Sequence, residues 1–201
     1  MRELVSIILA SASPRRLTLL SALGLDVNVE PSGVVEGDRP GVSAQRLAAF
    51  YAAAKADAVF ARNRAATVVA ADTVVDRDGA VLGKPADARS ARTMLRSLAG
   101  REHIVHTAYS IRAPEGRLDG AGSTRVHFAP LDDAAIDAYV ASGEPFDKAG
   151  AYGVQGPGAA LVERIDGDFY TVMGFPLGDF IRRLPELGLQ LPAQHRVPVL
   201  A

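Results

Sequence analysis

Arg15 and Arg16 are the first residues whose types and spacing point to chemistry. Ser13 is a favourable helix N-cap and Pro14 suits the first helical position, so both arginines are expected in the first turn of a helix. Cations there face the positive end of the helix dipole, which is unfavourable unless an anion lies nearby. Free backbone N–H groups and two guanidinium groups would together bind a polyphosphate. Solvated arginines, or arginines paired with a nearby acid, remain the alternative.

Asp72 is the strongest single candidate for a catalytic group. It interrupts a nearly continuous apolar run, residues 67–75, that predicts a buried central strand. An unpaired carboxylate is costly in a dry core, so Asp72 needs a cation, a metal ion or a shifted pKa. A catalytic role and a buried structural ion pair both remain open.

Lys84 is the expected partner of Asp72. The stretch 76–79 is a turn signal between β-branched runs, and a three-residue turn would set Asp76 opposite Ala80. Counting back along both strands then puts Asp72 opposite Lys84. The segment that ends at this lysine is not a P-loop, because it is one residue short and a proline follows where Ser or Thr is required. The lysine remains a point charge suited to a phosphate oxygen.

Three further features have both a functional and a plain structural interpretation. Residues 147–156, read DKAGAYGVQG, combine charges with glycines that let a backbone approach a ligand closely, although G-x-G-x-x-G is incomplete. Within this stretch, Tyr152 would either stack on a base or pack in the core. Glu36 lies in a loop rich in Gly and Pro, and Lys55 lies on a predicted helix; both are surface charges by default.

The elements that position these residues mix strands and helices. Strands are expected over 4–10, 26–30, 67–75, 103–112, 117–128, 159–165 and 169–173. Helices are expected over 14–23, 43–62, 87–98, 132–140 and 176–184. Because strict βαβ alternation is missing, the pattern favours an α/β or α+β fold with a mixed sheet. One domain, 1–184, is expected, followed by an exposed tail, 185–201, that contains three prolines.

Composition excludes several classes of function. A net charge of −1 argues against a nucleic-acid partner or an anionic membrane surface. The absence of cysteine excludes disulfides, a thiol nucleophile and a Cys-based zinc site. The N-terminus imitates a signal peptide, but Glu3 interrupts its basic region, and no stretch is long enough to span a membrane. A cytoplasmic protein is expected.

Four ordered blocks carry a family resemblance. They are S-x-S-P-R-R-x-x-L-L from Ser11, then AADTVV, LGKPAD and DKAGAYGVQG. In this order they resemble the Maf family of nucleoside triphosphate pyrophosphatases, over about residues 4–184. The resemblance implies a single elongated domain, with a mixed, largely antiparallel central sheet flanked by helices and a nucleotide-binding cleft. It also implies a homodimer, although no apolar stripe in the sequence demonstrates an interface.

The resemblance also implies roles for individual residues. Asp72 would be the catalytic base that deprotonates the attacking water. The triphosphate would be bound by Ser13, Arg15, Arg16, Lys55 and Lys84. A divalent cation, Mg²⁺ or Mn²⁺, would be held by Glu36 and Asp72. The family usually has Asp-Glu where this chain has Val35-Glu36, which weakens the metal assignment.

Three positions distinguish the branches of the family. Arg15, Thr73 and Gln155 match the branch that prefers dTTP and UTP, and an amide at 155 can pair with the O4/N3–H edge of a pyrimidine. The expected reaction gives the monophosphate and pyrophosphate and removes unwanted nucleotides. The alternatives are a nucleotide-binding regulator of cell division without turnover and a pyrophosphatase for modified purines.

Overall fold

A seven-stranded mixed sheet forms the centre of the computed structural model, which describes residues 1–37 and 39–195. Its strand order is β3-β2-β4-β6-β7-β8, and β5 also pairs with β4. The strands are β2 (Ser6–Leu9), β3 (Asp26–Val29), β4 (Val68–Arg77), β5 (Ala80–Leu82), β6 (Glu102–Ala113), β7 (Gly116–Phe128) and β8 (Val162–Asp166). Only β2 pairs in parallel, with β3 and β4, and every other pair in this sheet is antiparallel. The expected mixed, largely antiparallel sheet is confirmed.

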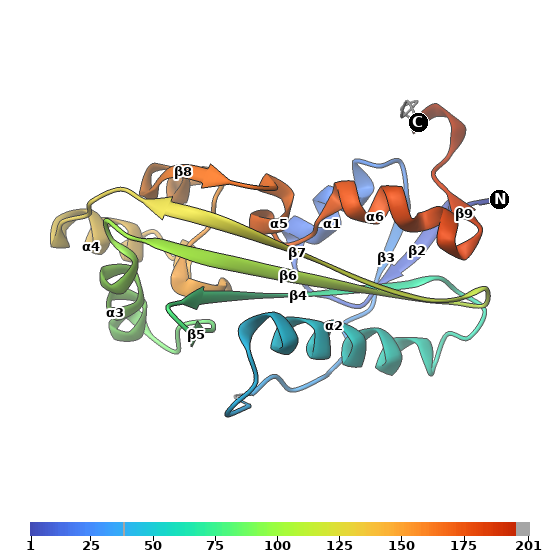
Figure 1. The fold of residues 1–201 in the computed structure, drawn as a ribbon, viewed down its shortest axis with the longest axis horizontal. Coiled ribbons are helices and arrows are strands. Elements are labelled where there is room, and N and C mark those ends of the chain that lie inside the picture. The colour runs from blue at the N-terminus through green and yellow to red at the C-terminus, as the bar shows by residue number, and fades with distance from the viewer. Residues whose placement is uncertain (38, 196–201) are drawn as a thin grey trace.

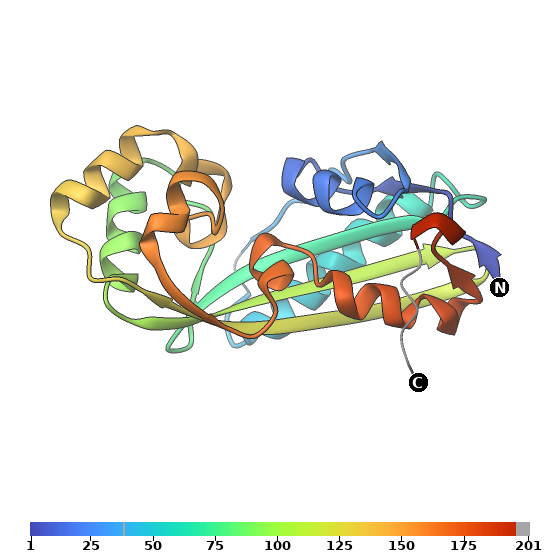
Figure 2. The same cartoon turned by 90° about the horizontal axis from the view of Figure 1, so that it is seen from above.

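Helices flank the sheet on both faces and at one end (Figures 1 and 2). They are α1 (Pro14–Ser21), α2 (Ala44–Phe60), α3 (Ala88–Leu98), α4 (Asp133–Ala141), α5 (Phe169–Met173) and α6 (Leu177–Arg183). The helix α2 covers one face, whereas α1, α5 and α6 lie on the other. At the far end of the elongated molecule, α3 and α4 pack with the short 3-10 segments η1 (Glu144–Asp147), η2 (Ala149–Ala151) and η3 (Gly156–Leu161).

Side-chain caps explain where three of the helices begin. The side chain of Ser43 accepts a hydrogen bond from the backbone of Arg46, and Asp132 caps α4 in the same way. Asp87 and Ser90 form a reciprocal capping box at the start of α3. Ser13 occupies the N-cap position of α1 but makes no side-chain cap hydrogen bond, and this helix ends at Ser21, earlier than predicted.

The hairpin between β4 and β5 corrects the predicted register. Asp78 and Gly79 have φ values of 55° and 85°, so they form a two-residue turn with Arg77 opposite Ala80. The expected three-residue turn, with Asp76 opposite Ala80, is wrong. The shorter turn is possible because aspartate tolerates the left-handed region, and the Asp76 carboxylate also accepts a hydrogen bond from the backbone of Gly79 at 2.7 Å.

Two C-terminal predictions are also wrong. Residues 169–173 form the helix α5 instead of a strand, because Asp168 accepts hydrogen bonds from the two backbone N–H groups of Tyr170 and Thr171. The chain from 185 to 191 is not an exposed tail. It forms the 3-10 segment η4 (Leu184–Leu187) and β9 (Leu189–Gln190), which pairs in parallel with β1 (Arg2–Glu3). Its three leucines, Leu187, Leu189 and Leu191, are buried. The end of the tail, 196–201, lies outside the described residues.

The connections around β2 create a crevice. β3 and β4 pair with opposite edges of β2. At the carboxyl end of β2 the chain therefore leaves the sheet between two strands that are reached in opposite directions. Along the outer edge of β4, pairing with β2 ends at Val69 and pairing with β5 begins at Val75. The intervening segment, 70–74, has no described strand on that side. Ligand sites in open sheets occur at such branch points.

Candidate active site

A cavity of about 730 Å³ lies at this gap in the sheet. Its wall is formed by the turn that enters α1, the loop 31–37, the middle of α2, the outer edge of β4 and the segment 147–154. Eight of the nine site residues predicted from the sequence line it: Ser13, Arg15, Arg16, Glu36, Lys55, Asp72, Thr73 and Lys84. The structure therefore brings together in one place residues from Ser13 to Lys84 of the chain.

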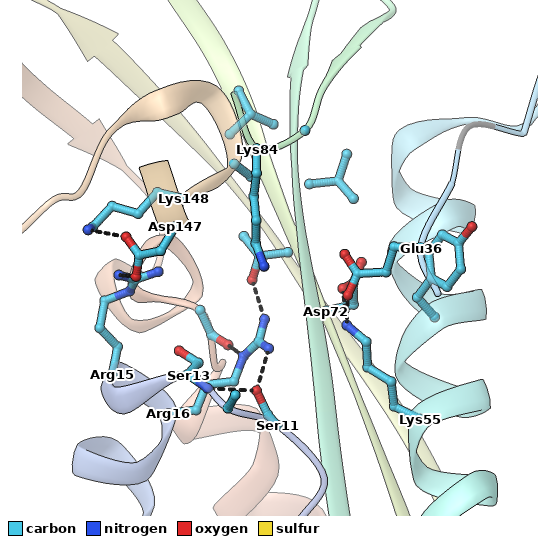
Figure 3. A pocket seen from close by; sticks show the side chains of 18 of the residues that line it. Ser11, Ser13, Arg15, Arg16, Glu36, Lys55, Asp72, Lys84, Asp147 and Lys148 are labelled. Atoms are coloured by element: carbon cyan, nitrogen blue, oxygen red, sulfur yellow. Dashed lines mark hydrogen bonds and ion pairs between the residues drawn. The ribbon is translucent and has the colours of Figure 1, made fainter. Parts of the chain in front are cut away.

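Asp72 pairs with Lys55, and not with Lys84 as the sequence predicted. The Lys55 ammonium lies 2.6 Å from the carboxylate of Asp72 and 2.5 Å from that of Glu36 (Figure 3). Asp72 and Lys55 are 5% and 7% exposed, so the pair is buried. Because pairing of β5 with β4 stops at Leu82, Lys84 never reaches the position across from Asp72.

The two carboxylates have opposite pKa shifts. Burial raises the pKa of Asp72, and the nearby Lys55 opposes this without cancelling it. Burial alone would also raise the pKa of Glu36, but its hydrogen bond with Lys55 and the charges of Lys55, Lys84 and Arg16 lower it overall. A carboxylate with a raised pKa is suited to accept a proton, whereas one with a lowered pKa stays ionised. The site therefore contains one group suited to a general base and one fixed anion.

Tyr51 holds the loop that carries Glu36. The phenol oxygen accepts a hydrogen bond from the Gly37 N–H at 2.7 Å and donates one to the Gly37 carbonyl at 2.6 Å. Tyr51 is itself 6% exposed on α2, one turn of helix before Lys55. One side chain of the helix thus fixes the loop, and the next one binds the carboxylate that the loop presents.

The buried guanidinium group of Arg16 lies on the face of β4 opposite to Lys55 (Figure 3). It donates to the carbonyl of Gly174 at 2.9 Å, to Ser11 Oγ at 3.1 Å and to Thr73 Oγ1 at 3.0 Å. Burial is the main cause of its lowered pKa, and the charge of Asp72 opposes this shift. Among the residues that the structure describes, these bonds use three of the five guanidinium N–H donors and leave the others for a ligand.

Arg15 is held more loosely than Arg16. Asp147 accepts a hydrogen bond from Arg15 at 3.3 Å and one from Lys148 at 2.6 Å. Lys148 also donates to the backbone carbonyl of Glu144. The arrangement matches the interpretation of Arg15 as an arginine paired with a nearby acid, and an exposed pair of this kind can be displaced by a stronger anion at little cost.

Lys84 is exposed at the cavity and makes no ion pair with any residue that the structure describes. The residue before it, Gly83, accepts a backbone hydrogen bond from Gly150 at 3.0 Å, which joins the Lys84 loop to the segment 147–154. The cavity therefore combines Lys84, which is in no ion pair with a described residue, with two arginines on its α1 side.

Gln155 is the one predicted site residue that the structure places outside the cavity. It is exposed, while Gly153 and Val154 beside it line the wall. Tyr152 also lines the wall but packs edge-on against Phe128, with ring centroids 4.7 Å apart, and bonds to His103 at 2.7 Å. For this tyrosine, the structure supports the packing interpretation.

Four supporting residues were missed by the sequence analysis: Ser11, Tyr51, Thr107 and Gly174. Ser11 and Gly174 bind Arg16, Tyr51 binds the Glu36 loop, and Thr107 binds Thr73 at 2.9 Å. Of these four residues, only Thr107 is marked by a pattern in the sequence. His103 and Thr107 are polar residues at an even spacing on one face of a predicted strand, and both are buried.

Glu36 and Asp72 are two carboxylates of the cavity that could bind a divalent cation. Among residues 1–37 and 39–195, no group of three or more His, Cys, Asp or Glu side chains could hold a metal ion. Glu36 and Asp72 nevertheless share the cavity and both contact the Lys55 ammonium, so a cation already occupies the space between them. Mg²⁺ is commonly bound by one or two carboxylates that are completed by substrate phosphates and water. Two carboxylates that line one cavity with Arg15, Arg16 and Lys84 fit that pattern.

Within the described part of the chain, no helix is both long enough and apolar enough to cross a bilayer.

Comparison with known proteins gives consistent matches. The family model described as Maf-like protein matches residues 6–187. A dTTP/UTP pyrophosphatase of Thermus thermophilus is 49% identical over 85% of this chain and 89% of its own length. Proteins of the same name from Thermococcus gammatolerans and Geobacter metallireducens are 46% and 45% identical; they cover 92% and 94% of this chain and 98% and 99% of their own lengths. The solved structure of the Staphylococcus aureus Ham1 protein, 15% identical, covers 62% of this chain and 72% of its own with a TM-score of 0.43.

Proposed function

This chain belongs to the Maf family, and on that premise we propose that it hydrolyses dTTP and UTP to the monophosphate and pyrophosphate. Relatives that bear the name dTTP/UTP pyrophosphatase match nearly the whole chain, which supports these substrates. The single observation that carries the proposal is that one cavity is lined by a buried carboxylate of raised pKa, Asp72, and by the cationic side chains of Arg15, Arg16 and Lys84.

Arg15, Arg16 and Lys84 would bind the triphosphate. The free donors of Arg16, the exposed Lys84 and the loosely paired Arg15 are all directed to the same cavity. The N-terminal turn of α1, with Ser13 at its start, adds backbone N–H groups. Binding would release Arg15 from Asp147 and neutralise the charge that develops on the leaving pyrophosphate.

Asp72 would act as the general base. It takes a proton from a water molecule whose oxygen attacks the α-phosphorus, while the bond from that phosphorus to the bridging oxygen breaks and pyrophosphate leaves. Lys55, held between both carboxylates, opposes the rise in the pKa of Asp72 that burial causes, and so favours the ionised form that a base requires. Lys55 on this account acts through Asp72 in addition to any contact with phosphate.

A divalent cation, Mg²⁺ or Mn²⁺, belongs to this proposal. Glu36 and Asp72 would hold it, and when bound it would supply charge neutralisation for the phosphate oxygens. Val35 in place of the usual acid leaves Glu36 as the loop's ligand, and the two hydrogen bonds between Tyr51 and Gly37 keep that ligand at the cavity.

The proposed cellular role is removal of unwanted nucleotides from the precursor pools. Such nucleotides are cytoplasmic, which makes the cytoplasm the proposed compartment. Thr73 and Gln155 as specificity residues, and the homodimer, stay predictions. The non-hydrolysing regulator is less favoured, because it gives no reason for the buried Asp72.

The experiment is to measure pyrophosphate release from all common nucleoside triphosphates with Mg²⁺ or Mn²⁺. We expect release from dTTP and UTP well above that from ATP or GTP. Asp72→Asn should lower kcat by about 10²–10⁴-fold with nucleotide binding kept. Asp76→Asn is the matched control, because Asp76 lies four residues along the same strand and outside the cavity wall. Orthophosphate in place of pyrophosphate, or binding without turnover, would contradict the proposal.

A further inference from the structure

A buried hydroxyl below the cavity has no role in the mechanism above. Thr107 on β6 is fully buried, and its Oγ1 lies 2.7 Å from the carbonyl oxygen of Thr171 and 2.9 Å from Thr73 Oγ1. A carbonyl only accepts, so the single proton of the Thr107 hydroxyl is donated to Thr171. In the contact between the two threonines, Thr73 must therefore be the donor.

The other contact of Thr73 has a fixed direction as well. Arg16 Nη2 lies 3.0 Å from Thr73 Oγ1, and a guanidinium only donates. The chain of hydrogen bonds thus runs in one sense, from Arg16 through Thr73 and Thr107 to the carbonyl of Thr171. The Thr73 hydroxyl has its proton and one lone pair engaged, and one lone pair left for a ligand in the cavity that it lines.

We propose that Thr107 is a positioning residue that turns Thr73 into an acceptor-only contact for the imide N3–H of uracil or thymine. The proposal rests on the function proposed above. Phosphate oxygens are acceptors and cannot use the free lone pair. A sugar hydroxyl can both donate and accept, so a fixed acceptor does not select for it. The imide N3–H is a donor that dTTP and UTP share, whereas N3 of cytosine is an acceptor and would face the lone pair of Thr73.

The matched variants are Thr107→Val and Thr107→Ser. Valine keeps the shape but removes the acceptor for Thr73, whose proton is then free to turn toward the cavity. Serine keeps the hydroxyl. Thr171 retains a partner in either case, since its carbonyl also accepts a hydrogen bond from the Gly174 N–H. Thr124→Val is the structural control: Thr124 is also buried and donates to a carbonyl next to α5, that of Asp168 at 3.0 Å, but does not contact Thr73.

The experiment measures dissociation constants by calorimetry for UTP and CTP analogues with an imido bridge between the α- and β-phosphates. These probes bind without turnover, so the inference is tested even if pyrophosphate release fails. We expect the wild-type protein to prefer the uracil analogue, and Thr107→Val to reduce that preference about tenfold, mainly by tighter binding of the cytosine analogue. Thr107→Ser and Thr124→Val should keep the wild-type ratio.

Three results would overturn the inference. The first is a wild-type protein that binds both analogues equally. The second is a Thr107→Val variant whose uracil-to-cytosine ratio is unchanged, or shifts no more than that of Thr124→Val. The third concerns the sugar: if the 3′-deoxy form of the UTP analogue loses affinity in wild type but not in Thr107→Val, the donor that Thr73 meets is the 3′-hydroxyl.

Discussion

Lys55 on α2 and Asp72 on β4 form a buried ion pair with 2.6 Å between the ammonium and the carboxylate. The same ammonium also binds Glu36 from the loop in front of α2, so one cation joins three elements of the site. Breaking a buried pair leaves an uncompensated charge. The ionisation of Asp72 therefore depends on Lys55 more than on any other residue.

The first prediction concerns the pH dependence of catalysis. Burial raises the pKa of Asp72, and Lys55 is the chief opposing influence. Lys55→Met should therefore raise this pKa further, which moves the acid limb of kcat/KM to higher pH and lowers the rate at neutral pH by about 10²-fold. Pyrophosphate release measured across a pH series checks this. Lys148→Met, which removes a lysine paired with Asp147, should leave the acid limb of kcat/KM at its wild-type pH. If the acid limb of Lys55→Met also stays at the wild-type pH, the assignment of Asp72 as the base is contradicted.

The second prediction separates the two arginines. Arg16 is buried and satisfies Ser11, Thr73 and the carbonyl of Gly174. Arg16→Lys should lower the free energy of unfolding by about 1–3 kcal/mol, because a single ammonium cannot reach all of these acceptors. Arg15→Lys alters only a partly exposed pair with Asp147 at 3.3 Å, so stability should change by no more than about 0.5 kcal/mol. Urea denaturation of both variants checks this, and equal losses would be the contrary result.

The elements that local chemistry determines are predictable from the sequence. The caps at Ser43, Asp87 and Asp132 mark helix starts without any tertiary information. The segment 169–173 is different, because its aromatic and β-branched residues favour a strand. Its helix is determined by the cap at Asp168, which offers its carboxylate to two backbone N–H groups. In this short segment, the N-terminal cap outweighs the intrinsic strand propensity of the residues.

The site is predictable as a set of residues but not as a set of pairs. Arg16 and Asp72 are each conspicuous alone, because a cation at a helix start and a carboxylate in an apolar run both need partners. Which partner each takes depends on the packing of α2 against β4, which no local pattern contains. Asp72 therefore pairs with Lys55 and not with Lys84, and the supporting hydroxyls of Tyr51 and Thr107 go unnoticed in the sequence.

The third prediction concerns the loop that carries Glu36. Tyr51→Phe removes both hydrogen bonds to Gly37 without changing the ring, so Glu36 should be less well held. If Glu36 helps to bind the divalent cation, the Mg²⁺ concentration for half-maximal activity should rise about tenfold, which is typical when a partner behind a metal ligand is lost. Glu36→Gln should raise it as well, and the double variant should show less than the sum of both effects. A Tyr51→Phe protein with lower stability but an unchanged Mg²⁺ requirement would limit Tyr51 to a structural role.

The last prediction is a pH dependence of stability rather than of catalysis. His103 is 2% exposed, and burial lowers its pKa from 6.5 to about 4. Between these values the unfolded chain binds a proton that the folded chain does not, so stability rises with pH across this window and falls as the pH is lowered. The loss from His103 reaches up to about 3 kcal/mol near pH 4. In His103→Gln this part of the slope should vanish.

Tyr152→Phe is the control for that measurement. It removes the hydroxyl that contacts His103 at 2.7 Å but leaves the imidazole in place. We therefore expect a lower stability at every pH, with the dependence between pH 6.5 and 4 kept, since burial is the main cause of the shift. Thermal unfolding of the wild type and both variants from pH 4 to 8 tests this. A slope that disappears in Tyr152→Phe would mean that the hydrogen bond, and not burial, keeps His103 neutral.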